Sequence, residues 1–262
     1  MRAARRVLAG LPIALEFLTP LRLRSVQQHD DRVFAEALGW YPAIGLLIGL
    51  ILLGLDQGLS ELLPAGPTAA ILVAALALTS GGLHLDGLAD TADGMAVQGD
   101  RDRRLEVMRS GTTGPAGVMA LVVVLLIAWS ALVSLEDPVR SGAIVLGPAL
   151  ARWAVIPVAT LFPPARTGGL GQTITAGLWP VAAPLGTVIA GVASAVLFGV
   201  TGLVTMLIAG VAALIVAGAA ARLLRGVTGD VFGAGIEVAQ VVVWLAMVAS
   251  TQRGWIEPAL LG

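Results

Sequence analysis

The chain has 262 residues, a mean hydropathy of +0.90 and only 13% charged residues. A soluble domain carries roughly 25% charge, so the bilayer must act as the solvent for much of this chain. The net charge of −1 excludes a general attraction to nucleic acid, and the absence of cysteine excludes disulfides, thiol catalysis and thiolate metal sites.

The N-terminus combines positive charge with an apolar stretch. Three arginines lie within residues 1–6, and Pro12 and Glu16 interrupt the apolar residues that follow. No small-residue cleavage site is evident. We therefore predict a short helix that lies at the membrane surface, with a signal peptide as the alternative.

Apolar segments separated by breaks fill the rest of the chain. A membrane-spanning helix needs roughly 20 residues, and we place spans at 33–55, 67–85, 115–135, 141–162, 177–199, 201–221 and 234–251. Residues 167–221 contain no charge and are too many for one crossing, so the turn is expected at Gly199 and Gly202. The prediction is an all-α polytopic bundle, one domain over residues 1–262, with seven spans and a range of six to eight.

The positive charges indicate the orientation. The chain has no lysine, so every permanent positive charge is an arginine. With the N-terminus in the cytoplasm, the outer side holds only Arg140 and Arg253, and Arg152 lies within a span. The inner side receives Arg2, Arg5, Arg6, Arg22, Arg24, Arg32, Arg101, Arg103, Arg104, Arg109, Arg166, Arg222 and Arg225. This bias predicts a bacterial inner-membrane protein whose loops at 86–114, 163–176 and 222–233 face the cytoplasm.

The richest polar stretch follows the second predicted span, over residues 81–94. Asp86, Asp90 and Asp93 stand at i, i+4 and i+7, so they share one face if that span continues as a helix past the membrane edge. Carboxylates so close together repel one another, and a hard cation such as Mg²⁺ or Mn²⁺ relieves this repulsion. We predict a metal site here, with a solvated, capped helix end as the alternative. His84 points away from this face and is either a structural residue or a substrate contact.

An arginine-rich loop comes next, over residues 100–114. Asp100 is expected to cap a short surface helix. The arginines of this loop lie beside the acidic stretch. Their guanidinium groups suit bidentate contacts to a pyrophosphate, while the aspartates hold the metal of that pyrophosphate. The alternative is an ordinary positively charged loop that anchors the topology.

Two later motifs are candidates for the same site. The glycine-rich turn 168–173 is either a substrate contact or a linker. Thr228-Gly229-Asp230 is expected to open the last helix, on which Asp230 and Glu237 share a face because they are seven residues apart. Glu237 interrupts an apolar stretch, where an ionisable group is costly and usually functional. The alternative is an internal partner for Arg152.

Taken together, these motifs resemble the cobalamin synthase family, the adenosylcobinamide-GDP ribazoletransferases. The resemblance runs from Phe17-Leu18-Thr19 through residues 45–49 to the last helix, and residues 81–94 are its most specific part. Residues 102–109, 169–171 and 228–230, with Gly233 and Glu237, also match. The family usually places an arginine directly after the threonine, whereas this chain has Pro20-Leu21-Arg22, so no role is carried over to Arg22.

The resemblance implies a reaction and its participants. Adenosylcobinamide-GDP and α-ribazole, or its 5′-phosphate, give adenosylcobalamin or its phosphate with release of GMP, in an integral membrane enzyme that needs Mg²⁺. The expected partners are these substrates and the lipid bilayer, with no nucleic acid, and a homo-oligomer stays open. The expected catalytic residues are Asp86, Asp90, Asp93 and Asp230, of which the first three bind the metal. The expected substrate contacts are His84, Arg103, Arg104, Glu106, Arg109, Arg152, Gly169, Gly171, Thr228 and Glu237.

Two alternative functions remain at this point. A CDP-alcohol phosphotransferase is the nearest, because residues 90–94 look like half of its motif, but the Ala-Arg pair and the later aspartates are missing. A transporter would suit glycine-rich helices and the intramembrane Arg152 and Glu237. Against it, the acids gather at one membrane face and no inverted repeat is visible.

Overall fold

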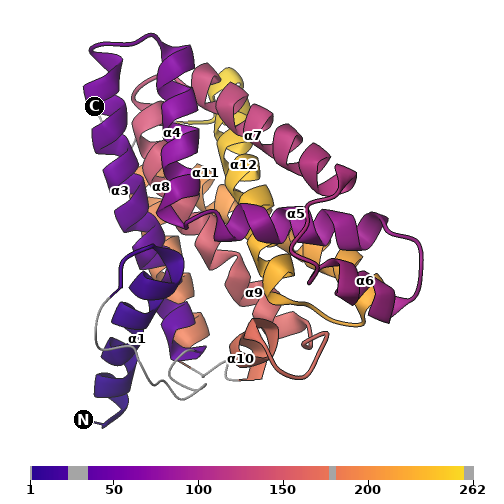
Figure 1. The fold of residues 1–262 in the computed structure, drawn as a ribbon. Coiled ribbons are helices and arrows are strands. Elements are labelled where there is room, and N and C mark those ends of the chain that lie inside the picture. The colour runs from indigo at the N-terminus through magenta and orange to yellow at the C-terminus, as the bar shows by residue number, and fades with distance from the viewer. Residues whose placement is uncertain (1, 23–34, 177–180, 257–262) are drawn as a thin grey trace.

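The computed structural model describes residues 2–22, 35–176 and 181–256, and in these ranges the regular elements are helices (Figure 1). One isolated β-bridge joins Pro164 to Val227. The elements are α1 (Arg2–Leu18), η1 (Leu38–Trp40), α3 (Tyr41–Ser60), α4 (Ala65–Thr79), α5 (Leu83–Ala96), α6 (Arg101–Val107), α7 (Pro115–Ser134), α8 (Val139–Trp153), α9 (Val155–Leu161), α10 (Leu170–Ala176), α11 (Ala182–Leu224) and α12 (Gly229–Gln252). The all-α prediction is confirmed.

The number of spans agrees with the predicted range. Five helical stretches are long and apolar enough to cross a membrane, and the bent pair α4–α5 adds a sixth. The 43-residue α11 counts once among them, but Phe198 and Gly199 have non-helical backbone angles. A Cβ at Gly202 would collide with the Ser194 carbonyl oxygen, so the chain reverses there. The predicted break is confirmed, and each predicted span has a helical counterpart, although residues 33–34 and 177–180 lie outside the described part.

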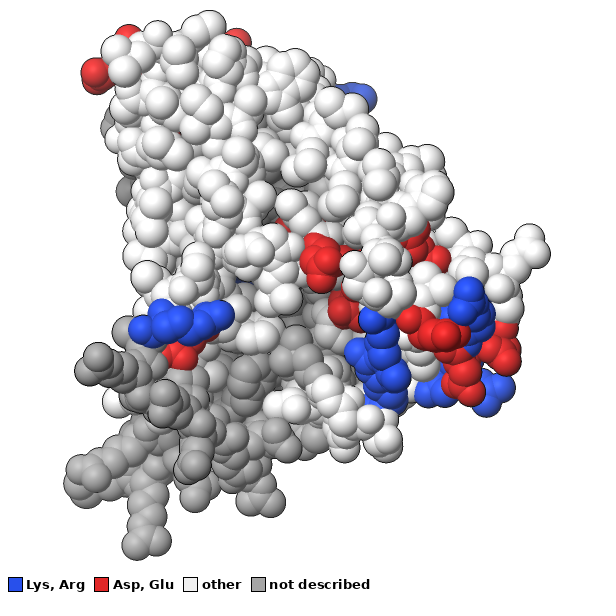
Figure 2. Space-filling model, in the orientation of Figure 1, with Lys and Arg blue, Asp and Glu red and all other residues white. Residues whose placement is uncertain are grey.

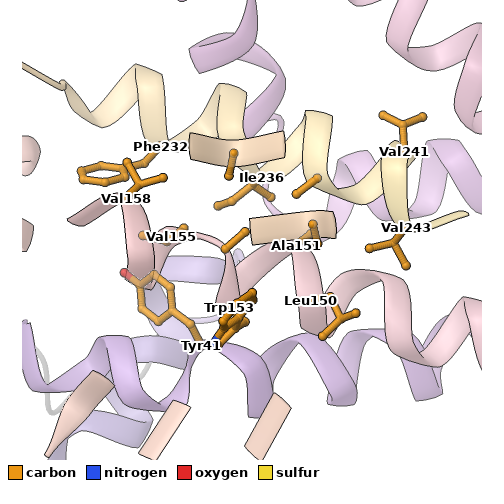
Figure 3. Packing of buried hydrophobic residues seen from close by; sticks show 14 of the residues in the cluster. Tyr41, Leu150, Ala151, Trp153, Val155, Val158, Phe232, Ile236, Val241 and Val243 are labelled. Atoms are coloured by element: carbon orange, nitrogen blue, oxygen red, sulfur yellow. The ribbon is translucent and has the colours of Figure 1, made fainter. Parts of the chain in front are cut away.

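Helices α8 and α9 form the centre of the bundle. Almost all residues of α8 and most residues of α9 are buried, and these helices pack against α3, α11 and α12 (Figure 3). Gly49 of α3 permits a close approach, because a Cβ there would lie 2.5 Å from the Val145 carbonyl oxygen of α8. Small residues at helix interfaces are the usual means of close packing in membranes. By contrast, large apolar side chains such as Leu50, Val122 and Leu207 are exposed, as a lipid-facing surface requires.

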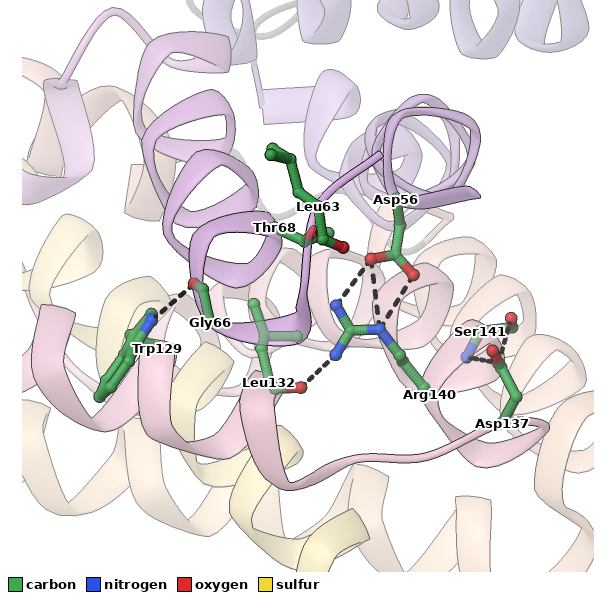
Figure 4. A network of polar contacts seen from close by, with 9 residues as sticks. All are labelled: Asp56, Leu63, Gly66, Thr68, Trp129, Leu132, Asp137, Arg140 and Ser141. Atoms are coloured by element: carbon green, nitrogen blue, oxygen red, sulfur yellow. Dashed lines mark hydrogen bonds and ion pairs between the residues drawn. The ribbon is translucent and has the colours of Figure 1, made fainter. Parts of the chain in front are cut away.

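A buried ion pair joins α3 to α8 near the end of α3 (Figure 4). Arg140 Nη2 donates to Asp56 Oδ1 at 2.6 Å, its Nε donates to Oδ2 at 3.0 Å, and its Nη1 donates to the Leu132 carbonyl. We expected Arg140 on the outer side, in the short loop between the predicted spans 115–135 and 141–162. The structure instead places it inside the helix packing, where the carboxylate and the carbonyl satisfy the guanidinium.

The second span does not continue straight into the acidic stretch, so that expectation is wrong. Gly81 and Gly82 have φ values of 60° and 79°, and α4 and α5 meet at 87°. Only glycine adopts this left-handed conformation without strain. Helix α5 therefore runs across the bundle, and we count α4 alone as the spanning part of the pair (Figure 1).

Charged side chains gather on one part of the surface. In Figure 2, acidic and basic atoms cluster over α5 and α6, whereas the upper part of this face is almost free of charge. Helix α1, predicted from the N-terminal pattern, packs against η1 and α3. That this helix lies at the membrane surface stays a prediction.

Candidate active site

Two glycines bring the acidic helix α5 into backbone contact with the start of α12. A Cβ at Gly87 would lie 2.8 Å from the Asp230 carbonyl oxygen, and one at Gly233 would lie 3.1 Å from the His84 carbonyl oxygen. Because the helices cross here, Asp86 and Asp90 of α5 come close enough to Asp230 for their charges to interact. We call Asp86, Asp90 and Asp230 the acidic crossing.

The acidic crossing changes the acidity of its central member. Partial burial, and then the charges of Asp86, Asp230 and Asp93, raise the pKa of Asp90 to about 6. Like charges and desolvation both disfavour the ionised form of a carboxyl group. A bound cation therefore stabilises the ionised form of such a carboxyl group more than it would stabilise that of an ordinary aspartate.

The third aspartate of the motif has a different environment. Asp93 is buried, and it accepts hydrogen bonds from the backbone amides of Gly114, at 2.6 Å, and of Gly117, at 2.8 Å. These amides begin α7, so the carboxylate satisfies N–H groups that otherwise lack a partner. Sequence reasoning missed this role, although the Gly114-Pro115 start of the third span was visible.

The crossing suits a phosphate-bound Mg²⁺ ion by its donor chemistry. Among the described residues, no three histidine or acidic side chains lie close enough to hold one ion as they stand. Mg²⁺ usually takes one or two carboxylates and completes its octahedron with water and substrate phosphates. Asp86, Asp90 and Asp230 offer oxygen ligands of this kind, and the metal site stays a prediction.

The arginine-rich loop forms the predicted short helix, α6. Asp100 caps it by accepting a hydrogen bond from the Arg103 amide at 2.9 Å. Arg103 pairs with Glu106 at 2.8 Å on the surface, and Arg104 donates to the Gly94 and Met95 carbonyls at the end of α5. Arg104 thus satisfies helix-end carbonyls. Arg109 is exposed, and the predicted phosphate contacts of this loop remain untested.

One arginine of this loop has a structural role that sequence reasoning did not identify. Arg101 Nε donates to the Leu224 carbonyl at 2.9 Å, and its Nη2 donates to the Ala165 carbonyl. Arg101 therefore ties α6 to the end of α11 and to the segment between α9 and α10. A positive charge in a loop gives no signal for such distant backbone partners.

The glycine-rich turn and the start of α12 lie side by side. Gly168 and Gly169 have positive φ values, and a Cβ at Gly171 would lie 3.0 Å from the Val227 carbonyl oxygen. Thr228 caps α12, as predicted, and its hydroxyl lies 3.0 Å from Asp230 Oδ2. This segment therefore positions Asp230.

Arg152 lies in the protein core, and Glu237 is half-buried on α12. Arg152 is 1% exposed, and its Nη1 donates to the Pro148 carbonyl at 3.2 Å. Its charge interacts with that of Glu237, but no ion pair within 4.0 Å joins them in the described part of the chain. The internal-partner interpretation of Glu237, and substrate contact by either residue, both stay untested.

Cavities lie on both sides of the acidic helix. An open cavity of about 680 Å³ is lined by Phe17, Arg22, the 80–83 turn and Asp86. It adjoins a smaller one of about 110 Å³, because both include Phe17, Leu83 and Asp86 among their lining residues. A third cavity of about 570 Å³ is lined by Asp93, Arg103 and Glu106. Arg22, to which we carried over no role, thus lies in the largest cavity beside the crossing.

The comparisons with known proteins agree with one another. The family described as cobalamin-5-phosphate synthase matches residues 10–248. A relative from Pseudomonas paraeruginosa, named adenosylcobinamide-GDP ribazoletransferase, is 43% identical over 65% of this chain and 69% of its own. Relatives of that name from Pseudomonas fluorescens and Roseiflexus are each 34% identical over 90% of this chain, and over 97% and 88% of their own lengths.

No solved structure matches the chain. The assignment therefore depends on sequence likeness, which covers every residue of the acidic crossing. The chain belongs to the cobalamin-5-phosphate synthase family.

Proposed function

We propose that this chain joins adenosylcobinamide-GDP to α-ribazole or its 5′-phosphate and releases GMP. A hydroxyl oxygen of the ribazole forms a bond to the phosphorus that carries the cobinamide, the bond from that phosphorus to GMP breaks, and the hydroxyl proton leaves to a base. The observation that carries the proposal is the acidic crossing beside the 680 Å³ cavity. The relatives' names support the substrates.

The metal is part of the proposal. Asp86 and Asp90, with Asp230 across the crossing, would hold Mg²⁺, whereas Asp93 keeps its two backbone amides at α7. When bound, Mg²⁺ neutralises charge on the diphosphate and on the leaving phosphate. This revises the sequence-based set, in which Asp93 was the third ligand, because its carboxylate already has partners.

The chain's own residues position the reacting groups. Thr228 orients the Asp230 carboxylate, and Asp230 is the base we propose for the ribazole hydroxyl. Arg22 and Asp86 face the same cavity, so the substrate diphosphate can meet a cation and the acidic crossing together. Phosphoryl transfer needs mainly such positioning and charge neutralisation.

The surroundings of the reaction follow from the arginine bias. We propose that the acidic crossing faces the cytoplasm of a bacterial inner membrane. The clustering of charge over α5 and α6 supports this orientation (Figure 2).

A reconstituted assay tests the proposed function. The purified full-length chain in lipid nanodiscs is mixed with adenosylcobinamide-GDP and α-ribazole, and GMP release is followed with Mg²⁺ and with a chelator. We expect release that the chelator abolishes and that Asp90→Asn lowers by at least about a hundredfold. Glu61→Gln, at an exposed acid beyond the end of α3, is the matched control and should retain full activity.

Two results would contradict the proposal. GMP release that resists the chelator would contradict the metal requirement. Full activity in a folded Asp90→Asn protein would contradict the role of the acidic crossing in the reaction.

A further inference from the structure

The 110 Å³ cavity beneath the acidic crossing holds three polar atoms without a hydrogen-bond partner in the described part of the chain. They are Tyr41 Oη, His84 Nε2 and Arg166 Nη1, and each of these atoms is fully buried. They come from three separate parts of the chain. Tyr41 begins α3, His84 lies in α5, and Arg166 lies between α9 and α10. Figure 3 shows the Tyr41 ring on the same side of the core as Val155 and Phe232, which also line this cavity.

Such a set is unusual in a folded protein. Most buried polar atoms have a hydrogen-bond partner, and each one left without costs roughly 1–3 kcal/mol. Tyr41 is 1% exposed and His84 is 4% exposed, so bulk water does not satisfy them. Three such groups line one cavity, so their hydrogen-bonding capacity is available to a single bound group.

The donors define the chemistry of that group. A guanidinium can only donate hydrogen bonds, and a tyrosine hydroxyl and an imidazole N–H can donate as well. The group best suited to accept hydrogen bonds from these three donors, one of which is positively charged, is an oxyanion. The cavity is also far below the roughly 300–1,000 Å³ of small-molecule sites, so it admits one functional group and not a whole nucleoside.

We propose that Tyr41, His84 and Arg166 bind one phosphate group of the substrates in this cavity, beside Asp86 and Asp230. The inference rests on the proposed function, which supplies two such groups. One is a phosphate of the corrinoid-linked diphosphate, and the other is the 5′-phosphate of a phosphorylated ribazole. Arg166 interacts with the Asp230 carboxylate, so we expect a divalent cation at the acidic crossing to strengthen phosphate binding.

Two variants remove hydrogen-bond donors from the cavity while keeping most of the packing. Tyr41→Phe keeps the ring stacked on Phe17, whose centroid lies 6.0 Å away, and Arg166→Gln removes the positive charge. Ser194→Ala is the matched control, because Ser194 Oγ is another buried, unpartnered hydroxyl but lies on α11 and does not line this cavity. Thermal unfolding in nanodiscs establishes that each variant is folded.

Steady-state kinetics with both acceptors identify the bound phosphate. A charged hydrogen bond corresponds to about a tenfold or larger change in KM. If Tyr41→Phe and Arg166→Gln raise KM only for α-ribazole 5′-phosphate, the cavity takes the acceptor phosphate. If they raise KM for adenosylcobinamide-GDP with either acceptor, it takes a phosphate of the diphosphate. Unchanged KM values for all three substrates overturn the proposal.

Binding of inorganic phosphate separates this inference from the proposed function. Titration calorimetry with Mg²⁺ should show binding to the wild-type and Ser194→Ala proteins, and about tenfold weaker binding to Arg166→Gln. A wild-type protein that binds phosphate in this way but releases no GMP would contradict the proposed function alone. Equal phosphate binding by the wild-type and Arg166→Gln proteins would contradict the inference alone.

Discussion

Asp86, Asp90 and Asp93 share one face of a helix, yet the structure gives them three different environments. Asp86 is exposed beside the 680 Å³ cavity, Asp90 is partly buried between acidic neighbours, and Asp93 is buried against two backbone amides. Spacing in the sequence identifies the shared face but not what packs against each turn. The division between cation-binding and structural aspartates therefore had to come from the structure.

The raised pKa of Asp90 predicts how Mg²⁺ affinity depends on pH. A carboxyl group with a pKa of about 6 is mostly protonated at pH 5, and Mg²⁺ must then displace the proton. Affinity should therefore fall by up to about tenfold per pH unit as the pH drops below 6, and should level off above 7. Titration calorimetry between pH 5 and 8 measures this. Asp90→Asn should flatten the profile, and an unchanged profile in that variant would contradict the assignment.

In the metal-free protein the same shift acts on stability. Because folding raises the pKa of Asp90 to about 6, its ionisation opposes folding fully above pH 6, and this effect is lost as the pH falls from 6 towards about 4, the ordinary pKa of an aspartate. Asp90→Asn should therefore not destabilise the metal-free protein at neutral pH.

At the scale of the elements, the position of α5 decides the site. The left-handed Gly81-Gly82 turn directs it across the bundle, Gly87 sets it against α12, and Asp93 fastens it to α7. Each of these contacts can be removed separately, so the structure makes distinct predictions for stability and for activity.

Asp93→Ala should destabilise the docking of α5 on α7. The substitution leaves the Gly114 and Gly117 amides without their acceptor, which costs about 1–3 kcal/mol of unfolding free energy. Denaturant unfolding in detergent micelles measures the change, with Asp102→Ala at an exposed acid of α6 as the control. Loss of Mg²⁺ binding without any loss of stability would contradict this role and would indicate that Asp93 is a metal ligand.

Gly87→Ala should separate α5 from α12. The added Cβ would lie 2.8 Å from a backbone atom that cannot rotate away, so the helices must shift, at a cost of about 1–3 kcal/mol. We expect transfer activity to fall by at least about tenfold, because a small displacement of the acids disturbs their geometry. Gly54→Ala, where a Cβ meets nothing within 4 Å, is the control and should keep full activity. Normal activity in Gly87→Ala would show that this close approach is unnecessary.

At the scale of the whole molecule, local signals predicted the architecture well. The helix starts at Asp100 and Thr228 and the break at Gly199 are fixed by short-range chemistry, and the structure confirms each of them. The 87° bend, the buried Arg140 and the inner cavity were not predicted, because each depends on contacts between distant segments. Arg140 shows this most clearly, since it falls between two predicted spans and its partner Asp56 is 84 residues away in the sequence.

The ion pair at the end of α3 should stabilise the bundle without affecting the acidic crossing. Asp56→Asn leaves a buried guanidinium without its charged partner, which costs about 3–5 kcal/mol. The double substitution Asp56→Leu with Arg140→Leu should recover much of this loss. Thermal unfolding compares the variants. Activity should persist wherever the protein stays folded, and a specific loss of GMP release in a folded variant would contradict this separation.

Binding of Mn²⁺ as a probe for Mg²⁺, followed by electron paramagnetic resonance, tests the central claim most directly. With adenosylcobinamide-GDP present, we predict that the wild-type and Asp93→Asn proteins bind the ion, and that Asp90→Asn and Asp230→Asn bind it at least about tenfold more weakly. Full Mn²⁺ affinity in folded Asp90→Asn and Asp230→Asn proteins would contradict a metal site at the crossing of α5 and α12.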